Sequence, residues 1–255
     1  MQKIFDAHFH VIDPKFPLTE NNGFLPDPYT AEQYRKECQD FPLEFVGGTV
    51  VSGSFQGYDQ SYFGAALSAL GTDYVGVTQL PVSTTDEEIL KLNKLGIRGI
   101  RFNLYRGLDT PLTDIELLAK RVYNLVGWGT EFYINLNTAD DELRQLILKL
   151  PKTSIDHLGM TVVPIDDLYR FITHDVRIRV SGFGRIAYER DQVKTMLPLL
   201  YQKNPHSLMF GTDLPATRAK YRFSMDDIYL IREALSNDSE AIDDILYRNA
   251  QNWYL

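Results

Sequence analysis

The sequence predicts an α/β fold, a (β/α)8 TIM barrel with an extra helix at its C-terminus, in a single domain that covers residues 1–255. Short β-type runs alternate eight times with longer helix-type runs, as in a barrel of eight strand-helix units. The length of 255 residues suits one such barrel. An open, doubly wound sheet is disfavoured, because the turn after the first strand reads Val11-Ile12-Asp13-Pro14 and lacks a G-x-G-x-x-G motif.

Eight short apolar runs are typical of buried strands. In chain order, the expected strands are residues 3–8, 46–52, 73–80, 97–103, 131–137, 153–157, 176–182 and 207–213.

Longer segments in which apolar residues recur at helical spacing are expected to form the helices. Thr84-Thr85-Asp86-Glu87 and Ser224-Met225-Asp226-Asp227 place a hydroxyl cap before first-turn acids, which favours helix starts there. Ile242, Ile245 and Leu246 predict a closing helix between Glu240 and Leu255. The other helices are expected at Thr30–Phe41, Gln60–Leu70, Thr84–Leu95, Thr113–Val126, Ala139–Leu150, Pro164–Thr173, Tyr188–Gln202 and Ser224–Leu235.

The longest irregular segment, Ile12–Thr30, contains four prolines and directly follows the first strand. Loops that follow barrel strands gather at the C-terminal mouth, where barrel enzymes hold their active sites. We expect this loop to form a lid or a wall of a site there, with a surface detour as the alternative.

Composition argues against several classes of protein. No run of about 18 apolar residues could span a membrane, and Met1-Gln2-Lys3 leads into a strand without the features of a signal peptide. A net charge of −8 without a Lys/Arg cluster argues against nucleic acid. The single cysteine, Cys38, suits a reducing compartment. We expect a cytoplasmic protein with a small-molecule partner and without nucleic-acid or membrane partners, and a homo-oligomer stays open.

Two of the five histidines, His8 and His10, lie one residue apart at the end of the first strand. Side chains alternate along a strand, so both imidazoles should point into the barrel together with Ile4 and Asp6. Phe5, Ala7 and Phe9 should face the helices. Two ring nitrogens on one face can converge on one ion or one oxygen, whereas the alternative is a pair of packed, hydrogen-bonded histidines.

Two further residues are expected at the same end of the barrel. His157 follows the sixth strand and Asp213 follows the eighth. A carboxylate there can hold a divalent cation or act as a general base toward water, although an Asp before Leu-Pro also suits a turn. His174 and His206 precede strands and are expected at the opposite rim, in structural or solvated positions.

Five motifs resemble the amidohydrolase superfamily, and within it the amidohydrolase-2 or 2-pyrone-4,6-dicarboxylate lactonase-like branch. They are DAHFH, GIRGIRFNL, IDHLG, RVSGF and FGTDLP, in this order from residue 6 to residue 215. The resemblance implies a distorted (β/α)8 barrel that hydrolyses esters or amides. It also implies that His8, His10, His157 and Asp213 are both the catalytic residues and the ligands of a metal.

The chain departs from the binuclear members of that superfamily in two strands. Strand four ends Arg101-Phe102-Asn103-Leu104 without the bridging lysine or acid, and strand five lacks the histidine. The resemblance therefore implies one divalent metal ion, zinc or manganese, or a metal-free site, because both occur among related lactonases.

Several arginines and tyrosines are placed to bind an anionic substrate, because a guanidinium fork matches a carboxylate. The expected substrate-binding residues are Arg101, Arg185, Tyr188, Arg218 and Tyr133. Tyr133, Asn135 and Asn137 should give the fifth strand a polar inner face. An ion pair or a solvated surface position is the alternative for each arginine.

The combined hypothesis is a hydrolase that opens a lactone or a related cyclic ester of a small carboxylated or hydroxylated compound. Asp213 would take a proton from the attacking water, and the histidines or their metal would polarise the carbonyl. A metal-dependent decarboxylase of an aromatic or unsaturated acid and a non-catalytic ligand-binding barrel remain the alternatives.

Overall fold

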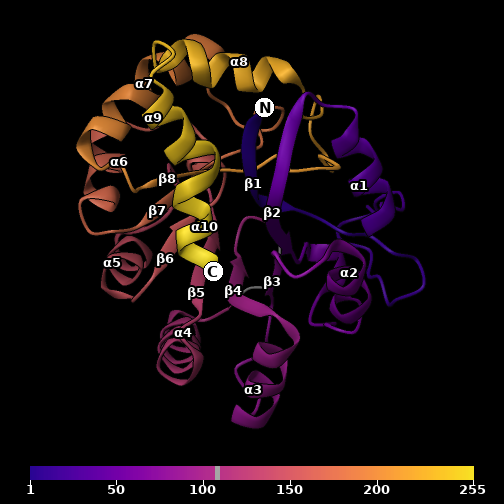
Figure 1. The fold of residues 1–255 in the computed structure, drawn as a ribbon. Coiled ribbons are helices and arrows are strands. Elements are labelled where there is room, and N and C mark those ends of the chain that lie inside the picture. The colour runs from indigo at the N-terminus through magenta and orange to yellow at the C-terminus, as the bar shows by residue number, and fades with distance from the viewer. Residues whose placement is uncertain (107–109) are drawn as a thin grey trace.

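The computed structural model describes residues 1–106 and 110–255, and its centre is one sheet of eight strands that follow each other in chain order. Neighbouring strands from β1 to β8 pair in parallel, and helices surround them (Figure 1). The predicted (β/α)8 barrel is confirmed. The strands are β1 (Gln2–Phe9), β2 (Leu43–Val51), β3 (Tyr74–Thr78), β4 (Ile97–Asn103), β5 (Gly129–Tyr133), β6 (Thr153–Ile155), β7 (Arg177–Val180) and β8 (Leu208–Phe210).

Each of the eight predicted helices has a counterpart. Thr85 and Ser224 cap α3 and α8 as expected, each within a capping box. The helices are α1 (Ala31–Gln39), α2 (Phe63–Leu70), α3 (Asp86–Leu95), α4 (Leu112–Val126), α5 (Asp141–Lys149), α6 (Ile165–Ile172), α7 (Arg190–Lys203), α8 (Met225–Ala234), α9 (Ser239–Asp243) and α10 (Asn249–Tyr254), with short turns η1 (Ser54–Gln56), η2 (His157–Gly159) and η3 (Asp244–Arg248). The predicted closing helix is α9, the π-helical η3 and α10 in succession. None of the described helices is long and apolar enough to cross a membrane.

The barrel closes between β1 and the segment that follows β8. Asp213 N donates to His8 O at 2.8 Å, and His10 N donates to Leu214 O at 2.8 Å. The buried Asp6 carboxylate fastens the same seam, because it accepts hydrogen bonds from both Thr212 N and Thr212 Oγ1. The closure therefore brings the first-strand histidines beside the residues that follow the last strand.

The interior of the barrel is layered. At the end that α10 covers, Phe5 and Met209 belong to a small apolar cluster with Tyr254 of α10 (Figure 1). Above it lies a layer of buried ion pairs, in which Arg179 bridges Glu131 and Asp156. The histidines and Asp213 lie above this ionic layer, at the C-terminal ends of the strands, where barrel enzymes have their active sites.

The simple alternation predicted for β1 is wrong for its first half. The pairing of β1 with β2 shifts between Asp6 and Phe9, as at a β-bulge. Before the shift, Phe5 and Ala7 point into the barrel, and Asp6 points outward, where Tyr34 Oη donates to Asp6 Oδ2 at 3.0 Å. After it, Phe9 stacks on Tyr34 outside, so the extra residue is what turns His8 and His10 to the inside.

Strands β5 to β8 end earlier than predicted. β5 ends at Tyr133, so the expected polar inner face does not extend to Asn135 and Asn137. Asn135 instead accepts hydrogen bonds from Thr161 Oγ1 and Asn137 N in the loop that follows. A side chain beyond the last paired residue is no longer held to the alternation of the strand.

Candidate active site

Four predicted residues meet at one point inside the mouth of the barrel. The Nε2 atoms of His8, His10 and His157 lie 3.8, 3.7 and 3.8 Å from Asp213 Oδ1. All four side chains are buried. The three imidazoles thus present one nitrogen each to a single carboxylate oxygen.

Backbone conformation places His157 and Asp213 after their strands. His157 begins the short turn η2 with a φ of 51°, and Asp213 has a φ of 58°. Such left-handed conformations cost energy for residues other than glycine and cluster at functional sites. Two glycines leave room for the rings: a Cβ on Gly211 would lie 2.8 Å from His8 Cβ, and one on Gly182 would lie 2.7 Å from His157 Nδ1.

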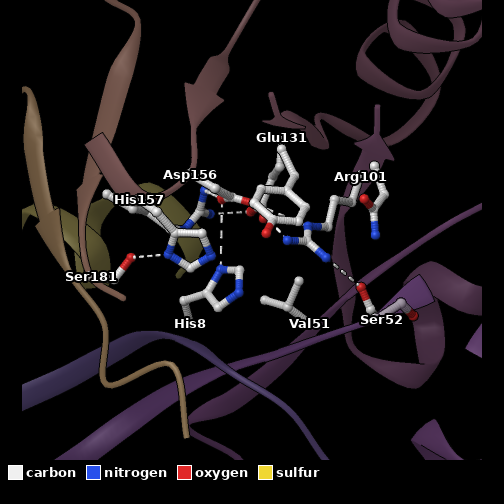
Figure 2. Close-up of polar contacts among 12 residues, drawn as sticks. His8, Val51, Ser52, Arg101, Glu131, Asp156, His157 and Ser181 are labelled. Atoms are coloured by element: carbon white, nitrogen blue, oxygen red, sulfur yellow. Dashed lines mark hydrogen bonds and ion pairs between the residues drawn. The ribbon is translucent and has the colours of Figure 1, made fainter. Parts of the chain in front are cut away.

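Two of the imidazoles are oriented by a hydrogen bond at Nδ1, and the third faces a carboxylate there. His10 Nδ1 donates to Val51 O at 2.7 Å, and His157 Nδ1 shares a hydrogen bond of 2.9 Å with Ser181 Oγ. His8 Nδ1 faces Asp156 Oδ1 at 3.6 Å (Figure 2). A donor at Nδ1 leaves Nε2 as a bare lone pair, which fixes the tautomer of His10.

The charges of the site follow from burial and from Arg185. Burial lowers the pKa of His157 to about 3 and holds the pKa of His8 well below its ordinary value, so both imidazoles are neutral at pH 7. Burial alone would raise the pKa of the Asp213 carboxyl, but Arg185 and His157 outweigh it and hold that pKa well below the usual range. Arg185 Nε forms an ion pair with Asp213 Oδ2 at 2.7 Å.

The same donor set fits one divalent cation. The ligand atoms of His8, His10 and Asp213 all lie within 4.8 Å of one another. His8 Nε2, His157 Nε2 and Asp213 Oδ1 are buried and have no hydrogen-bond partner among the described residues. Ligands of a tetrahedral ion with bonds of about 2.0–2.2 Å lie about 3.4 Å apart. The three distances from the Nε2 atoms to Asp213 Oδ1, 3.7 to 3.8 Å, exceed this separation by only a few tenths of an ångström.

Arg101 reaches the interior as predicted, but its guanidinium is already occupied. Its Nε and Nη2 donate to Asp156 Oδ2 at 3.0 and 2.8 Å, and its Nη1 donates to Ser52 O at 2.9 Å (Figure 2). Arg101 also lines the small cavity above His10, so its contact with a substrate stays a prediction, although its fork already holds an internal carboxylate.

A small cavity of about 30 Å³ lies directly above His10. Four of the predicted substrate-binding residues line it, namely Arg101, Tyr133, Arg185 and Arg218. Arg106, which the sequence pattern did not single out, lines it too. Arg106 Nε is buried and has no hydrogen-bond partner among the described residues. Its place three residues after the fourth strand, in the loop at the mouth, was the signal that could have identified it.

The loop Ile12–Thr30 forms part of this cavity, as expected for a lid or wall. Phe24 lines it, with its ring 4.3 Å from the Arg218 guanidinium carbon. Arg218 Nη2 also donates to Asn21 O at 2.5 Å. The loop therefore contacts one of the cavity arginines directly.

Tyr188 is not among the residues that line the cavity, and its role in substrate binding stays a prediction. Its hydroxyl accepts a hydrogen bond from Val163 N at 3.3 Å, and the residue belongs to the buried hydrophobic core. His174 and His206 are exposed and lie before β7 and β8, as predicted.

Comparisons with known proteins show the family of the chain. A family model described as Amidohydrolase matches residues 5–255. The chain is 26% identical over 241 residues to a 2-pyrone-4,6-dicarboxylate hydrolase of Comamonas testosteroni, covering 84% of this chain and 77% of the relative. It is 26% identical over 230 residues to a 4-sulfomuconolactone hydrolase of Rhizobium radiobacter, covering 83% of this chain and 75% of that one.

Solved structures share the fold. A probable 2-pyrone-4,6-dicarboxylic acid hydrolase of Acinetobacter baumannii superposes with a TM-score of 0.81 at 22% identity, over 98% of both chains. A putative 2-pyrone-4,6-dicarboxylic acid hydrolase of Pseudomonas putida gives a TM-score of 0.82 at 22% identity, over 100% of this chain and 99% of that chain.

Proposed function

This chain belongs to the amidohydrolase family, and we propose that it hydrolyses a lactone or a related cyclic ester of a small carboxylic acid. The observation that carries the proposal is the convergence of three imidazole Nε2 atoms on one oxygen of Asp213, at 3.7 to 3.8 Å. The names of the two relatives support it, since one acts on a pyrone with two carboxylates and the other on a sulfonated lactone.

Asp213 is the proposed proton carrier. As a buried, ionised carboxylate, it accepts a proton from a water molecule whose oxygen forms a bond to the lactone carbonyl carbon. The ring C–O bond then breaks, and protonated Asp213 returns the proton to the leaving alkoxide. The product is one open-chain molecule that carries a new carboxylic acid and a new hydroxyl group, so water is the only co-reactant.

His8, His10 and Asp213 would hold one divalent ion together with His157, whose Nε2 lies 3.8 Å from Asp213 Oδ1, with zinc and manganese both suitable for this donor set. Such an ion would supply positive charge to the carbonyl oxygen when bound. The orientation of His10 favours this role over direct hydrogen bonding to the substrate, because its Nδ1 carries the proton and its Nε2 has none to donate.

The cavity arginines are the proposed binding site for a substrate carboxylate. Arg106, Arg185 and Arg218 line the same small space, and of these Arg185 pairs with Asp213. Arg106 and Arg218 repel each other there, since the charge of Arg106 adds to burial in lowering the pKa of Arg218. A carboxylate between them would relieve this repulsion and orient the ring for attack.

A substrate panel tests the proposal. Purified protein, supplied with zinc or manganese, is incubated with pyrone and furanone lactones that carry a carboxylate and with their neutral counterparts. We expect ring opening of carboxylated lactones, seen as release of one acid per turnover without carbon dioxide. Carbon dioxide release would point to a decarboxylase instead, and inertness toward every carboxylated lactone would contradict the proposal.

A further inference from the structure

One buried carboxylate beside the site has no part in the mechanism above. Asp156 follows β6, directly before His157, and its side chain is fully buried. It belongs to the ionic layer under the histidines, and its Oδ1 is the atom that faces His8 Nδ1 at 3.6 Å (Figure 2).

Two arginines hold this carboxylate in one orientation. Two nitrogens of Arg101 donate hydrogen bonds to Asp156 Oδ2, at 3.0 and 2.8 Å, and Arg179 Nη1 donates one to Asp156 Oδ1 at 2.9 Å. Each arginine is anchored in turn on the backbone: Arg101 on Ser52 O at 2.9 Å, and Arg179 on Ala7 O at 3.1 Å. Because both oxygens are engaged, the Asp156 carboxylate cannot rotate away from His8 without breaking charged hydrogen bonds.

The anchor on Ala7 also ties Arg179 to the backbone of β1 next to His8. Ala7 lies in the irregular part of β1, where the pairing with β2 shifts. The same guanidinium therefore contacts both Asp156 and the strand that carries His8. The position of the carboxylate relative to the ring is set from both sides.

His8 differs from the other two histidines in what lies behind its ring. His10 is oriented by a neutral carbonyl and His157 by a hydroxyl. For His8, the group behind Nδ1 is a carboxylate, a few tenths of an ångström beyond hydrogen-bond distance. A carboxylate behind a ligating imidazole fixes the tautomer and makes the other nitrogen a stronger donor of electrons.

We propose that Asp156 is a positioning residue that keeps the proton of His8 on Nδ1. The lone pair of His8 Nε2 is then free and points toward Asp213 Oδ1. The role of His8 in the reaction rests on the proposed function. The tautomer of His8 does not depend on that function, so the tautomer and the reaction can be tested separately.

Glu131 provides a matched control. It is the second carboxylate of the same ionic layer, is also buried, and forms an ion pair with the same Arg179. Tyr254 Oη donates to the same carboxylate oxygen, Oε1, that Arg179 contacts. Among the described residues, no hydrogen bond or ion pair joins Glu131 to any of the three site histidines. Asp156→Asn and Glu131→Gln therefore each remove one negative charge from one network, but only Asp156→Asn changes the group behind His8.

The first measurement is the nitrogen NMR spectrum of the metal-free wild-type protein labelled with 15N-histidine. The five histidines can be assigned by single substitutions, with His8→Gln removing the signals of His8. We expect a protonated Nδ1 and a bare Nε2 for His8. A His8 that carries its proton on Nε2 would overturn the proposal, even if neither variant folds.

The second measurement is titration of the metal-free wild type and both variants with Mn²⁺ alone, followed by the same spectra. In Asp156→Asn we expect the His8 tautomers to mix and the Mn²⁺ affinity to fall about 10–100-fold. Glu131→Gln should lower the melting temperature but keep the wild-type tautomer and most of the affinity. Equal losses of affinity in the two variants, or an unchanged His8 spectrum in Asp156→Asn, would show that Asp156 only balances charge.

Neither readout uses a lactone. Failure of the substrate panel with the expected spectra would therefore reject the proposed reaction and keep the positioning role. Ring opening with an Nε2-protonated His8 would do the reverse.

Discussion

At the scale of single residues, the site depends on which nitrogen of each histidine faces inward. His10 is turned by the Val51 carbonyl, and His157 by Ser181. These contacts place the Nε2 atoms of both rings toward Asp213 Oδ1. Nitrogen lone pairs that converge on one buried point, where no protein group donates a hydrogen bond to them, are typical of a cation site.

We therefore predict that the purified protein retains one divalent ion per chain and loses it on His10→Ala. Removal of the ion with a chelator should lower the melting temperature, because a ligand that binds only the folded state stabilises it. Elemental analysis and thermal unfolding measure both effects. His174→Ala, which removes an exposed histidine, is the control and should keep the ion. A protein that binds no ion and ignores the chelator would refute this prediction.

Arg106 is predicted to select substrates that carry a carboxylate. Hydrogen bonds to charged groups contribute about 1.5–3 kcal/mol, so Arg106→Gln should raise KM for a carboxylated lactone about 10–100-fold. Steady-state kinetics on a matched neutral lactone provide the internal control, where KM should hardly change. Equal effects on both lactones would argue for a structural role of Arg106 instead.

At the scale of elements, the sequence pattern predicted all eight strands and helices but not the path of β1. Alternation places His8 on the face of Asp6, yet the two side chains point to opposite sides, since the pairing shifts between Asp6 and Phe9. Bulges depend on how the neighbouring strand packs, and alternation in one strand carries no sign of that. The early end of β5 at Tyr133 was not predicted for the same reason: a strand ends where its pairing with the neighbouring strand ends, and the sequence pattern does not show that residue.

The start of α8 gives a prediction of pH-dependent stability. Burial raises the pKa of Asp227 to about 6, against an ordinary value of 3.8. The folded protein therefore binds more protons than the unfolded chain between these values, and its stability falls as pH rises through that window. The loss amounts to about 3 kcal/mol at most, since one pKa unit corresponds to about 1.4 kcal/mol.

Asp227→Asn removes this ionisation and keeps an oxygen as a hydrogen-bond acceptor. Its stability relative to wild type should increase as the pH rises from 4 to 7, measured by urea unfolding. Asp226→Asn is the control, because it removes the same charge from an exposed position one residue earlier. A difference between wild type and Asp227→Asn that is constant with pH would contradict the burial argument.

At the scale of the whole molecule, strand order decides which distant residues can form a site. The first and last strands of a closed barrel become neighbours, so His8 and Asp213 meet across the seam although about 200 residues separate them. This part was predictable from the sequence, because the fold class fixes the neighbours. The partners of Arg101 and Arg179 were not, because no periodicity shows which buried charges face each other.

The central claim is that Asp213 transfers the proton in a hydrolysis at this seam, and Asp213→Asn tests it most directly. The variant keeps the size of the side chain but cannot accept the proton, so kcat on a carboxylated lactone opened by the wild type should fall about 10²–10⁴-fold. Circular dichroism should show that the barrel still folds. A folded Asp213→Asn protein that opens the same lactone at nearly the wild-type rate would contradict the account.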